Sequence, residues 1–512
     1  MGLILYLVKF VYVWRYKTMG NLFIKKDIHL LTKEANETDI DDEKTLKRTL
    51  NATNLIALGI GAIIGAGLFV RTAAAAANNA GPSVTLGFII AAIGCALAGL
   101  CYAEFASMIP IAGSAYTYSY ATMGEFMAWI IGWDLVLEYA LGAATVGIAW
   151  SEYLNKLLEY VGMHIPYEWC HSPFETSMAG VTGIMNLPAL FIILLLSLLL
   201  IRGTKESAWV NGIIVIAKVA IVILFIVFGW SFINPINHAN YIPEATTYVD
   251  SQGVDHNYGG IMGILGAAGV VFFAFIGFDA VSTAAQESKN PKRDMPIGIL
   301  GSLAICTVLY ILFAHVLTGV ASIDDFRNQG KEASIAYAIK TYMTGYGWLA
   351  KLVTVAILAG FSSVILVMLM GQSRVFYSMS RDGLIPPVFS VLHSKFRTPY
   401  KSNLIFLVFV GSFAAFVPGD IVGDMTSIGT LFAFILVCAG VMILRKTNPE
   451  IHRSFKAPLV PLVPILGIIV CLAMIFGLGW ANWSRLLVWL AIGFIIYFGY
   501  SRKHSKLNNP DK

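Results

Sequence analysis

Hydrophobic residues in this chain gather in long runs separated by short polar segments. Runs of about 20 apolar residues recur between residues 51 and 500, and each is long enough to cross a bilayer as a helix. The pattern predicts an all-α integral membrane protein. We expect twelve membrane-spanning helices, at approximately 51–77, 83–110, 122–155, 186–202, 207–233, 258–284, 295–321, 346–379, 402–418, 424–445, 461–480 and 484–500.

The composition agrees with this pattern. Of the 512 residues, 57% are hydrophobic and 13% are charged, whereas soluble domains average about 25% charged residues. The polar segments are also too short to hold a core of their own. A soluble protein is therefore excluded, and we expect no separate soluble domain.

Lysine and arginine concentrate in every second polar segment. Because basic loops stay on the cytoplasmic side, this alternation places both termini in the cytoplasm, in a multi-pass protein of the cytoplasmic membrane. The dispersal of these residues among apolar runs argues against a nucleic-acid partner and for surrounding membrane lipid. The basic segments contain Lys25, Lys26, Lys33, Lys44, Lys47 and Arg48; Arg202 and Lys205; Lys289, Lys292 and Arg293; Arg381, Lys395, Arg397 and Lys401; Arg445, Lys446, Arg453 and Lys456; and Arg502, Lys503 and Lys506.

The spacing of the runs divides the chain into five parts. We expect a cytoplasmic segment at 1–50, a first five-helix repeat at 51–234, a second at 258–445, two further helices at 461–500, and a cytoplasmic tail at 501–512. Residues 1–18 make a poor signal peptide, because Lys9 interrupts a short apolar stretch and no small-residue cleavage site follows. We expect translation to begin at Met19, with a short interfacial anchor as the alternative.

Six cysteines are present, and none of them forms a CxxC motif or a Cys/His metal spacing. We therefore expect the cysteines to be free thiols that pack in the interior, and we expect no metal and no cofactor.

The first apolar run is unusually rich in glycine. Gly59, Gly61, Gly65 and Gly67 fall within nine residues. Close packing of helices explains the four-residue spacing of Gly61 and Gly65, but it does not require glycines only two residues apart. Glycine lowers the cost of leaving helical geometry, so we predict that this helix is interrupted around Gly65.

The sixth run has glycines at Gly269 and Gly277, followed by Asp279. Interrupted helices at matching positions of two repeats indicate a transporter binding site. Backbone NH groups at the first break favour a carboxylate, and carbonyl groups freed at both breaks favour an ammonium. One site could therefore bind both charged groups of an amino acid.

Ionisable residues inside spans are costly and usually functional. Lys218 lies in the middle of an apolar run, too far from either end to reach the interface easily. A lysine that switches between neutral and charged forms there could couple transport to protons. Asp134 and Glu138 lie one turn apart on one helix face. Either acid could pair with Lys218, line the cavity, or form a structural polar pair.

Three other charged residues flank the predicted site. Glu104 and Asp279 lie nearer the cytoplasmic ends of their spans, where a gate or a loop contact is as reasonable as a substrate role. Arg71 follows the first break on the outer side, as a gate or an interfacial cation.

Several motifs in the same order resemble the amino acid–polyamine–organocation superfamily, and in particular bacterial members of its cationic amino acid transporter branch. The resemblance covers roughly residues 50–500. It is carried by Gly61–Phe69, by Tyr102–Glu104 with Ile109–Tyr116, by Gly277–Asp279 with Glu287–Pro291, and by Ser380–Pro386.

The resemblance implies a LeuT-like fold, with a five-plus-five inverted repeat and two additional helices. It also implies roles for matched positions. Backbone at Gly65, Ala66 and Gly67 would bind the substrate carboxylate, and carbonyls of Ile63, Phe273, Ala274 and Ile276 would bind its ammonium. Lys218 matches the fifth-helix lysine of proton-coupled members, and Glu138 matches a third-helix acid.

Three positions qualify these roles. Ala66 lacks the hydroxyl that some relatives have there, so the carboxylate depends on backbone NH groups. Arg71-Thr72-Ala73 replaces an apolar-Thr-Gly sequence, which affects the gate. Met368 is expected to face the side-chain pocket, where an apolar group favours a neutral substrate over arginine.

The sequence therefore predicts a permease that imports L-amino acids with protons and without sodium. The alternatives are an amino acid exchanger without proton coupling and a nutrient receptor that does not transport. An enzyme is not expected, because the sequence shows no nucleophile–base pair, metal cluster or phosphate loop. A small single-span subunit remains open as a partner.

Overall fold

The computed structural model describes residues 22–27, 50–108, 114–177, 180–202, 208–249, 255–283, 288–328, 334–396 and 398–509. Residues 1–18, where a start site was questioned, lie outside this part of the chain, and so does most of the predicted N-terminal segment.

The described chain is a mostly helical membrane protein. Seven helical stretches are long and apolar enough to cross a bilayer, and five shorter apolar helices accompany them. Each predicted span overlaps one or more of these helices. They are α3 (Ala52–Ile63), α5 (Val84–Met108), α7 (Glu125–Val136), α8 (Gly142–Glu159), α9 (Leu187–Arg202), α10 (Ala208–Gly229), α11 (Gly260–Phe272), α13 (Pro291–Val320), α16 (Gly347–Arg381), α17 (Tyr400–Phe416), α18 (Gly419–Thr447), α19 (Leu462–Gly477) and α20 (Trp480–Ile496).

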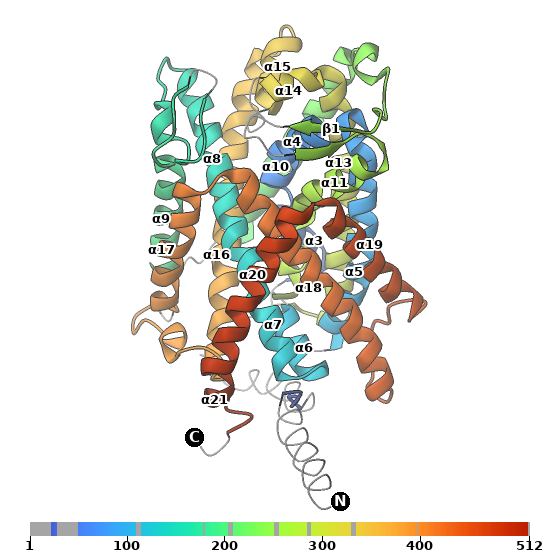
Figure 1. The fold of residues 1–512 in the computed structure, drawn as a ribbon, viewed down its shortest axis with the longest axis vertical. Coiled ribbons are helices and arrows are strands. Elements are labelled where there is room, and N and C mark those ends of the chain that lie inside the picture. Colours follow the sequence, from blue (N-terminus) through green and yellow to red (C-terminus); the bar gives the residue numbers. More distant parts are fainter. Residues whose placement is uncertain are drawn as a thin grey trace, which may run out of the picture.

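Short elements cap the two ends of the bundle. Helix α6 (Ser114–Thr122) and helix α21 (Arg502–His504) lie at one end, which we call the terminal end (Figure 1). Helices α14 (Ile323–Asn328) and α15 (Ser334–Tyr342) lie at the other, the loop end, with strand β1 (Thr246–Val249) (Figure 1). Strand β1 pairs antiparallel with β2 (Asp255–Tyr258), so that Thr246 lies opposite Tyr258.

The outer helices present apolar side chains outward. On α9, Leu194, Leu195, Leu198 and Leu199 are each between 40% and 48% exposed. Lipid tails are as apolar as leucine, so such a face is stable against a bilayer. The bundle interior instead holds buried aromatic and polar groups, and it is there that the helix breaks lie.

A buried carboxylate ties the C-terminal tail to the terminal end. Glu125, at the start of α7, accepts hydrogen bonds from Tyr120 Oη at 2.8 Å and Tyr497 Oη at 3.2 Å. It also accepts from Ser505 Oγ, and from Asn508 Nδ2 at 2.8 Å. Hydrogen bonds satisfy this fully buried charge, so the tail packs as part of the bundle.

Candidate functional site

The first broken helix is interrupted where glycine predicted it. Helix α3 ends at Ile63, and Ile64 is extended, with φ −72° and ψ 104°. After Gly65 and Ala66, a wider π-type turn runs from Gly67 to Arg71 and continues into α4 (Thr72–Ala75). The predicted interruption around Gly65 is therefore confirmed, while its role in binding a carboxylate stays a prediction.

The second break lies at the end of α11. A 3₁₀ turn, Phe273–Phe275, follows the helix, and Ile276 is then extended with ψ 135°. Gly277 has φ +112°, a conformation that side chains disfavour, before α12 (Ala280–Thr283) begins. The interruption near Gly277 is confirmed as well.

The two breaks lie against each other in the middle of the bundle. A Cβ atom built on Gly67 would lie 2.2 Å from the Cα atom of Ala274 and 2.5 Å from its backbone nitrogen. Real Cβ atoms do not approach other atoms so closely, so only glycine allows this contact. Glycine at position 67 thus brings the predicted carboxylate site next to the predicted ammonium site.

A tyrosine that was not predicted from the sequence joins the two breaks. Tyr310, on α13, is fully buried, and its hydroxyl lies 3.0 Å from the carbonyl oxygens of both Ile63 and Ala274. These are two of the four carbonyls predicted to bind the substrate ammonium. A tyrosine in an apolar helix is usually a packing residue, so its sequence position alone gave no signal.

Lys218 is buried and reaches the first broken helix. Its Nζ atom donates to the carbonyl oxygen of Gly61 at 2.8 Å. A Cβ atom on Gly360 of α16 would lie 2.6 Å from the Cε atom of Lys218, so glycine leaves room for the lysine stem. Lys218 therefore links α10, α3 and α16 beside the break.

The acids of the third span do not pair with Lys218. Among the described residues, no ion pair joins Lys218 to Asp134 or Glu138. Glu138 instead lies beside Asp279, whose Oδ2 atom accepts a hydrogen bond from Tyr139 Oη at 2.7 Å. The pairing considered from the sequence is thus not formed among the described residues, where Glu138 lies beside Asp279 instead.

Glu138 belongs to a wider turn of its helix. A π-type turn, Leu137–Leu141, joins α7 to α8, and such turns often mark functional sites. Asp134, one turn earlier, faces Gly429 of α18, and neither of its carboxyl oxygens has a hydrogen-bond partner in the described part of the chain. Buried carboxylic groups of this kind are expensive without partners, which makes them candidates for function.

The surroundings of Met368 are apolar. A Cβ atom on Gly142 would lie 3.0 Å from the Sδ atom of Met368 and 3.5 Å from the methyl carbon of Thr426. One turn earlier on α16, a Val364 methyl would lie 3.3 Å from a Cβ atom on Gly65. Small residues on the facing helices thus accommodate large apolar side chains next to the first break.

Toward the loop end, Arg71 lies buried beyond the first break. Its side chain is 3% exposed and forms ion pairs with Asp420, at 2.8 Å, and with Asp424. Helix α18 begins at Gly419, five residues before the predicted start of this span, so both aspartates lie within its first turns. The sequence prediction missed these partners because they lie about 350 residues from Arg71 in the chain, and only helix packing brings them together.

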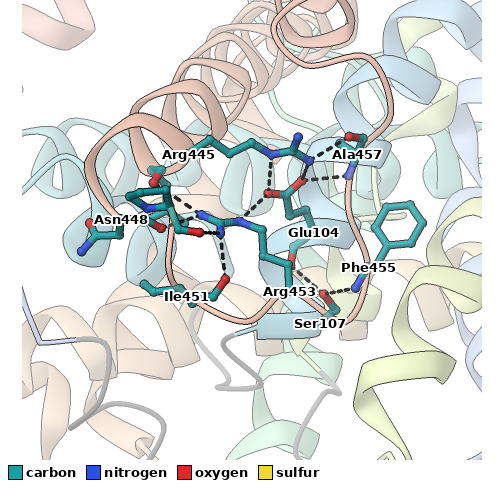
Figure 2. A network of polar contacts seen from close by, with 10 residues as sticks. Glu104, Ser107, Arg445, Asn448, Ile451, Arg453, Phe455 and Ala457 are labelled. Atoms are coloured by element: carbon teal, nitrogen blue, oxygen red, sulfur yellow. Dashed lines mark hydrogen bonds and ion pairs between the residues drawn. The ribbon is translucent and has the colours of Figure 1, made fainter.

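Toward the terminal end, Glu104 joins α5 to α18 and to the segment that follows α18. Its carboxylate accepts from Arg445 at 3.1 and 2.6 Å and from the backbone nitrogen of Ala457 at 2.8 Å, and it lies 3.3 Å from Arg453 (Figure 2). Glu104 therefore makes the loop contact that was predicted as one alternative, beside a gate and a substrate role.

Comparison with known proteins decides the family. Residues 50–499 match the amino acid permease family. The chain belongs to that family. It is 43% identical over 489 residues to the branched-chain amino acid permease BcaP of Bacillus subtilis (strain 168), covering 96% of this chain and 99% of that protein.

Two further relatives extend the comparison. The permease is 41% identical to the methylthioribose transporter of Bacillus subtilis (strain 168), over 96% of this chain and 100% of that protein. It is 28% identical to the vacuolar cationic amino acid transporter 4 of Arabidopsis thaliana, over 92% of this chain and 94% of that protein. The predicted membership of the superfamily is confirmed, and the permease is a transporter and not an enzyme.

Proposed function

We propose that this permease is a secondary active transporter that imports L-amino acids across the cytoplasmic membrane, by alternating access around the two broken helices. The contact between Gly67 and Ala274 carries this proposal, because it brings two helix breaks together at one buried place. We further propose the LeuT-like arrangement of two inverted five-helix repeats and two added helices, twelve spans in all, with both termini in the cytoplasm.

In this site, the backbone of Gly65, Ala66 and Gly67 binds the carboxylate, and carbonyls at Ile63, Phe273, Ala274 and Ile276 bind the ammonium. Tyr310 supports the second part, because its single proton already stabilises two of these carbonyls. A substrate ammonium would replace that donor with a stronger, charged one.

A neutral aliphatic side chain fits the neighbourhood of this site best. Met368 and Val364 offer apolar surface, and a cationic side chain would be left without a partner among them. The name of the BcaP relative agrees with a branched-chain substrate. Methylthioribose is the second candidate, because a relative almost as similar bears that name.

Proton coupling would use two groups of charges. Lys218 is buried, and in the described part of the chain its hydrogen-bond partner is the carbonyl of Gly61, so its charged form depends on the position of the first broken helix. Glu138 and Asp279 lie side by side, and two buried carboxyl groups so placed favour sharing a proton. Movement of either broken helix would change the surroundings of these groups.

Uptake of labelled L-leucine into proteoliposomes tests the proposal. We expect an inward proton gradient to stimulate uptake and sodium to have no effect, with competition by valine and isoleucine but not by methylthioribose. Lys218→Met should abolish the stimulation. Lys351→Met is the matched control, because this lysine is exposed on α16 and its Nζ atom lies 5.6 Å from the centre of the Tyr160 ring.

Each alternative gives a different result. Counterflow that ignores the gradient would indicate an exchanger, and binding without uptake would indicate a receptor. Full gradient-driven uptake by Lys218→Met would refute the coupling role of the lysine. Uptake that requires a co-expressed single-span subunit would assign the permease a partner.

A further inference from the structure

An open groove lies at the terminal end, where α13 begins. Because α13 ends at Val320, close to α14 at the loop end, its first residues lie at the terminal end (Figure 1). The groove has a volume of about 730 Å³, within the range of about 300–1,000 Å³ that is typical of small-molecule sites. Residues between 290 and 301 form one wall, and Ser454 and Phe455, from the segment after α18, form the other. We call it the basal groove.

Buried contacts hold the second wall of the basal groove in place. The backbone nitrogen of Phe455 donates to Ser107 Oγ at 3.3 Å, and the backbone nitrogen of Ala457 donates to Glu104 at 2.8 Å (Figure 2). Both acceptors are buried on α5. The groove is therefore preformed, and a site with fixed walls loses little free energy to ordering when a ligand binds.

The basal groove is positively charged. Lys292 and Arg293 line it and are exposed, and Lys289 and Lys456 are exposed next to lining positions in the chain. None of these cations forms an ion pair within the part of the chain that the structure describes. The described lining residues include no carboxylate, and Asp294 of α13 is buried outside the wall. The groove is therefore suited to an anion.

An exposed apolar stripe continues from the groove along α13. Its members lie on one face of the helix and are 37% to 58% exposed: Ile297, Ile305, Val308 and Leu312. Arg293 lies one turn before Ile297, so the charged end and the stripe are continuous. From Ile297 to Leu312 the stripe spans about 22 Å at about 1.5 Å per residue, which exceeds the roughly 15 Å of one leaflet of the hydrocarbon core. An acyl chain could therefore follow it over its whole length.

We propose that the basal groove binds an anionic phospholipid, with its phosphodiester headgroup on Lys292 and Arg293 and an acyl chain along the stripe. Charge alone would suit a free phosphate equally well. Only a lipid, however, also has an apolar part that covers the stripe. Basic pockets beside helices at the membrane surface are suited to anionic headgroups, which supports this choice.

The groove also adjoins the first broken helix. A Cβ atom built on its lining residue Gly301 would lie 3.1 Å from the Cδ1 atom of Ile56 on α3. A bound lipid would thus cover the junction of α3 and α13 at the terminal end. The proposal goes beyond amino acid transport, since it depends on no substrate.

Lipid titration followed by native mass spectrometry tests the basal groove. The full-length protein in a neutral detergent is titrated with phosphatidylglycerol, or with phosphatidylcholine that has the same acyl chains. Two cations near a membrane surface contribute about 30-fold in affinity for an anionic lipid, so the wild type should bind phosphatidylglycerol about 30-fold more tightly than phosphatidylcholine. Inorganic phosphate at the same concentrations should not displace the lipid.

Two variants remove the site in different ways. Lys292→Gln/Arg293→Gln removes two exposed charges, and Ser454→Trp fills the groove from an exposed lining position without changing a charge. The preference for phosphatidylglycerol should fall to about twofold or less in the double variant, and Ser454→Trp should weaken binding of this lipid about tenfold. Lys503→Gln/Lys506→Gln is the matched control, because it removes the same charge from exposed residues at the terminal end that are not part of the wall. It should keep the wild-type preference.

Several outcomes would overturn the proposal. Equal affinity of the wild type for the two lipids would do so, and so would wild-type binding of phosphatidylglycerol by either variant. Displacement of the lipid by inorganic phosphate would indicate an anion site without an acyl chain. Loss of the preference in the control would assign it to the overall charge of this end. Failure of leucine uptake would overturn the proposed transport alone, because this titration needs no substrate.

Discussion

Replacing Gly67 by alanine tests whether the contact between the two breaks is essential. The added Cβ atom would lie 2.2 Å from the Cα atom of Ala274, whereas ordinary contacts begin at 3.4 Å. The two backbones must therefore separate by about 1.2 Å, since the repulsion at the shorter distance is too strong to tolerate. Neither backbone has a flexible side chain that could absorb this shift.

We expect a large loss of transport and a smaller loss of stability. Overpacking in a dense interior costs about 1–3 kcal/mol of stability, whereas moving binding groups by about 1 Å can lower a rate about 100-fold. Uptake of L-leucine by Gly67→Ala in proteoliposomes should therefore fall about 100-fold. The melting temperature, followed by size-exclusion chromatography after heating, should fall by only a few degrees.

Two other glycines provide a graded series. A Cβ atom on Gly65 would lie 3.3 Å from a methyl group of Val364, which calls for a shift of a few tenths of an ångström. On Gly99, the nearest atoms would lie 3.6 Å away, in ordinary contact. Uptake should thus decrease in the order Gly99→Ala, Gly65→Ala, Gly67→Ala. Wild-type KM and kcat in Gly67→Ala would refute the role given to this contact.

Three further substitutions examine the contacts around the site. Tyr310→Phe leaves two buried carbonyls without their donor, so the ligand-free protein should lose about 1–3 kcal/mol of stability and melt at a lower temperature. Added leucine should raise the melting temperature of the variant more than that of the wild type. Glu104→Gln removes the buried charge between two arginines and should destabilise the protein by about 3 kcal/mol, measured by thermal melting. At the loop end, burial lowers the pKa of His171, but the hydrogen bond and charge of Glu152 outweigh it and raise the pKa to about 9. The folded pKa lies above the unfolded value of about 6.5, so the ion pair stabilises the protein fully below pH ~6.5, and this stabilisation is lost as the pH rises through about 9. The difference in melting temperature between wild type and His171→Gln should therefore shrink over that range. A constant difference would contradict the ion pair.

Much of the fold could be predicted because long hydrophobic runs predict the helices that face lipid. The break at Gly65 was predictable from the local density of glycines, whereas the break near Gly277 was predicted because its helix occupies the matching position of the second repeat. The first is a local property of a few neighbouring residues, and the second depended on the spacing of the spans. The length of a run says less about where its helix begins, and for this reason α18 was placed five residues too late.

The contacts between distant segments could not be predicted in the same way. Tyr310 lies 247 residues from Ile63 in the chain, and Arg71 lies 349 residues from Asp420. Only the packing of the helices decides which charged or polar faces meet. Likewise, Lys218 and Glu138 both stood out as buried ionisable residues, but the sequence could not show that one turns toward Gly61 and the other toward Asp279.

The hydrogen bonds of Glu125 to the C-terminal tail bear on how the protein is best engineered. Ser505 and Asn508 supply two of the four side-chain donors to this buried carboxylate. A reporter or purification tag fused after Lys512 leaves those donors in place, whereas a truncation after Ser501 removes both. Shortening the tail to obtain a more compact crystallisation sample would therefore expose the base of α7, and internal loops are the better place to trim.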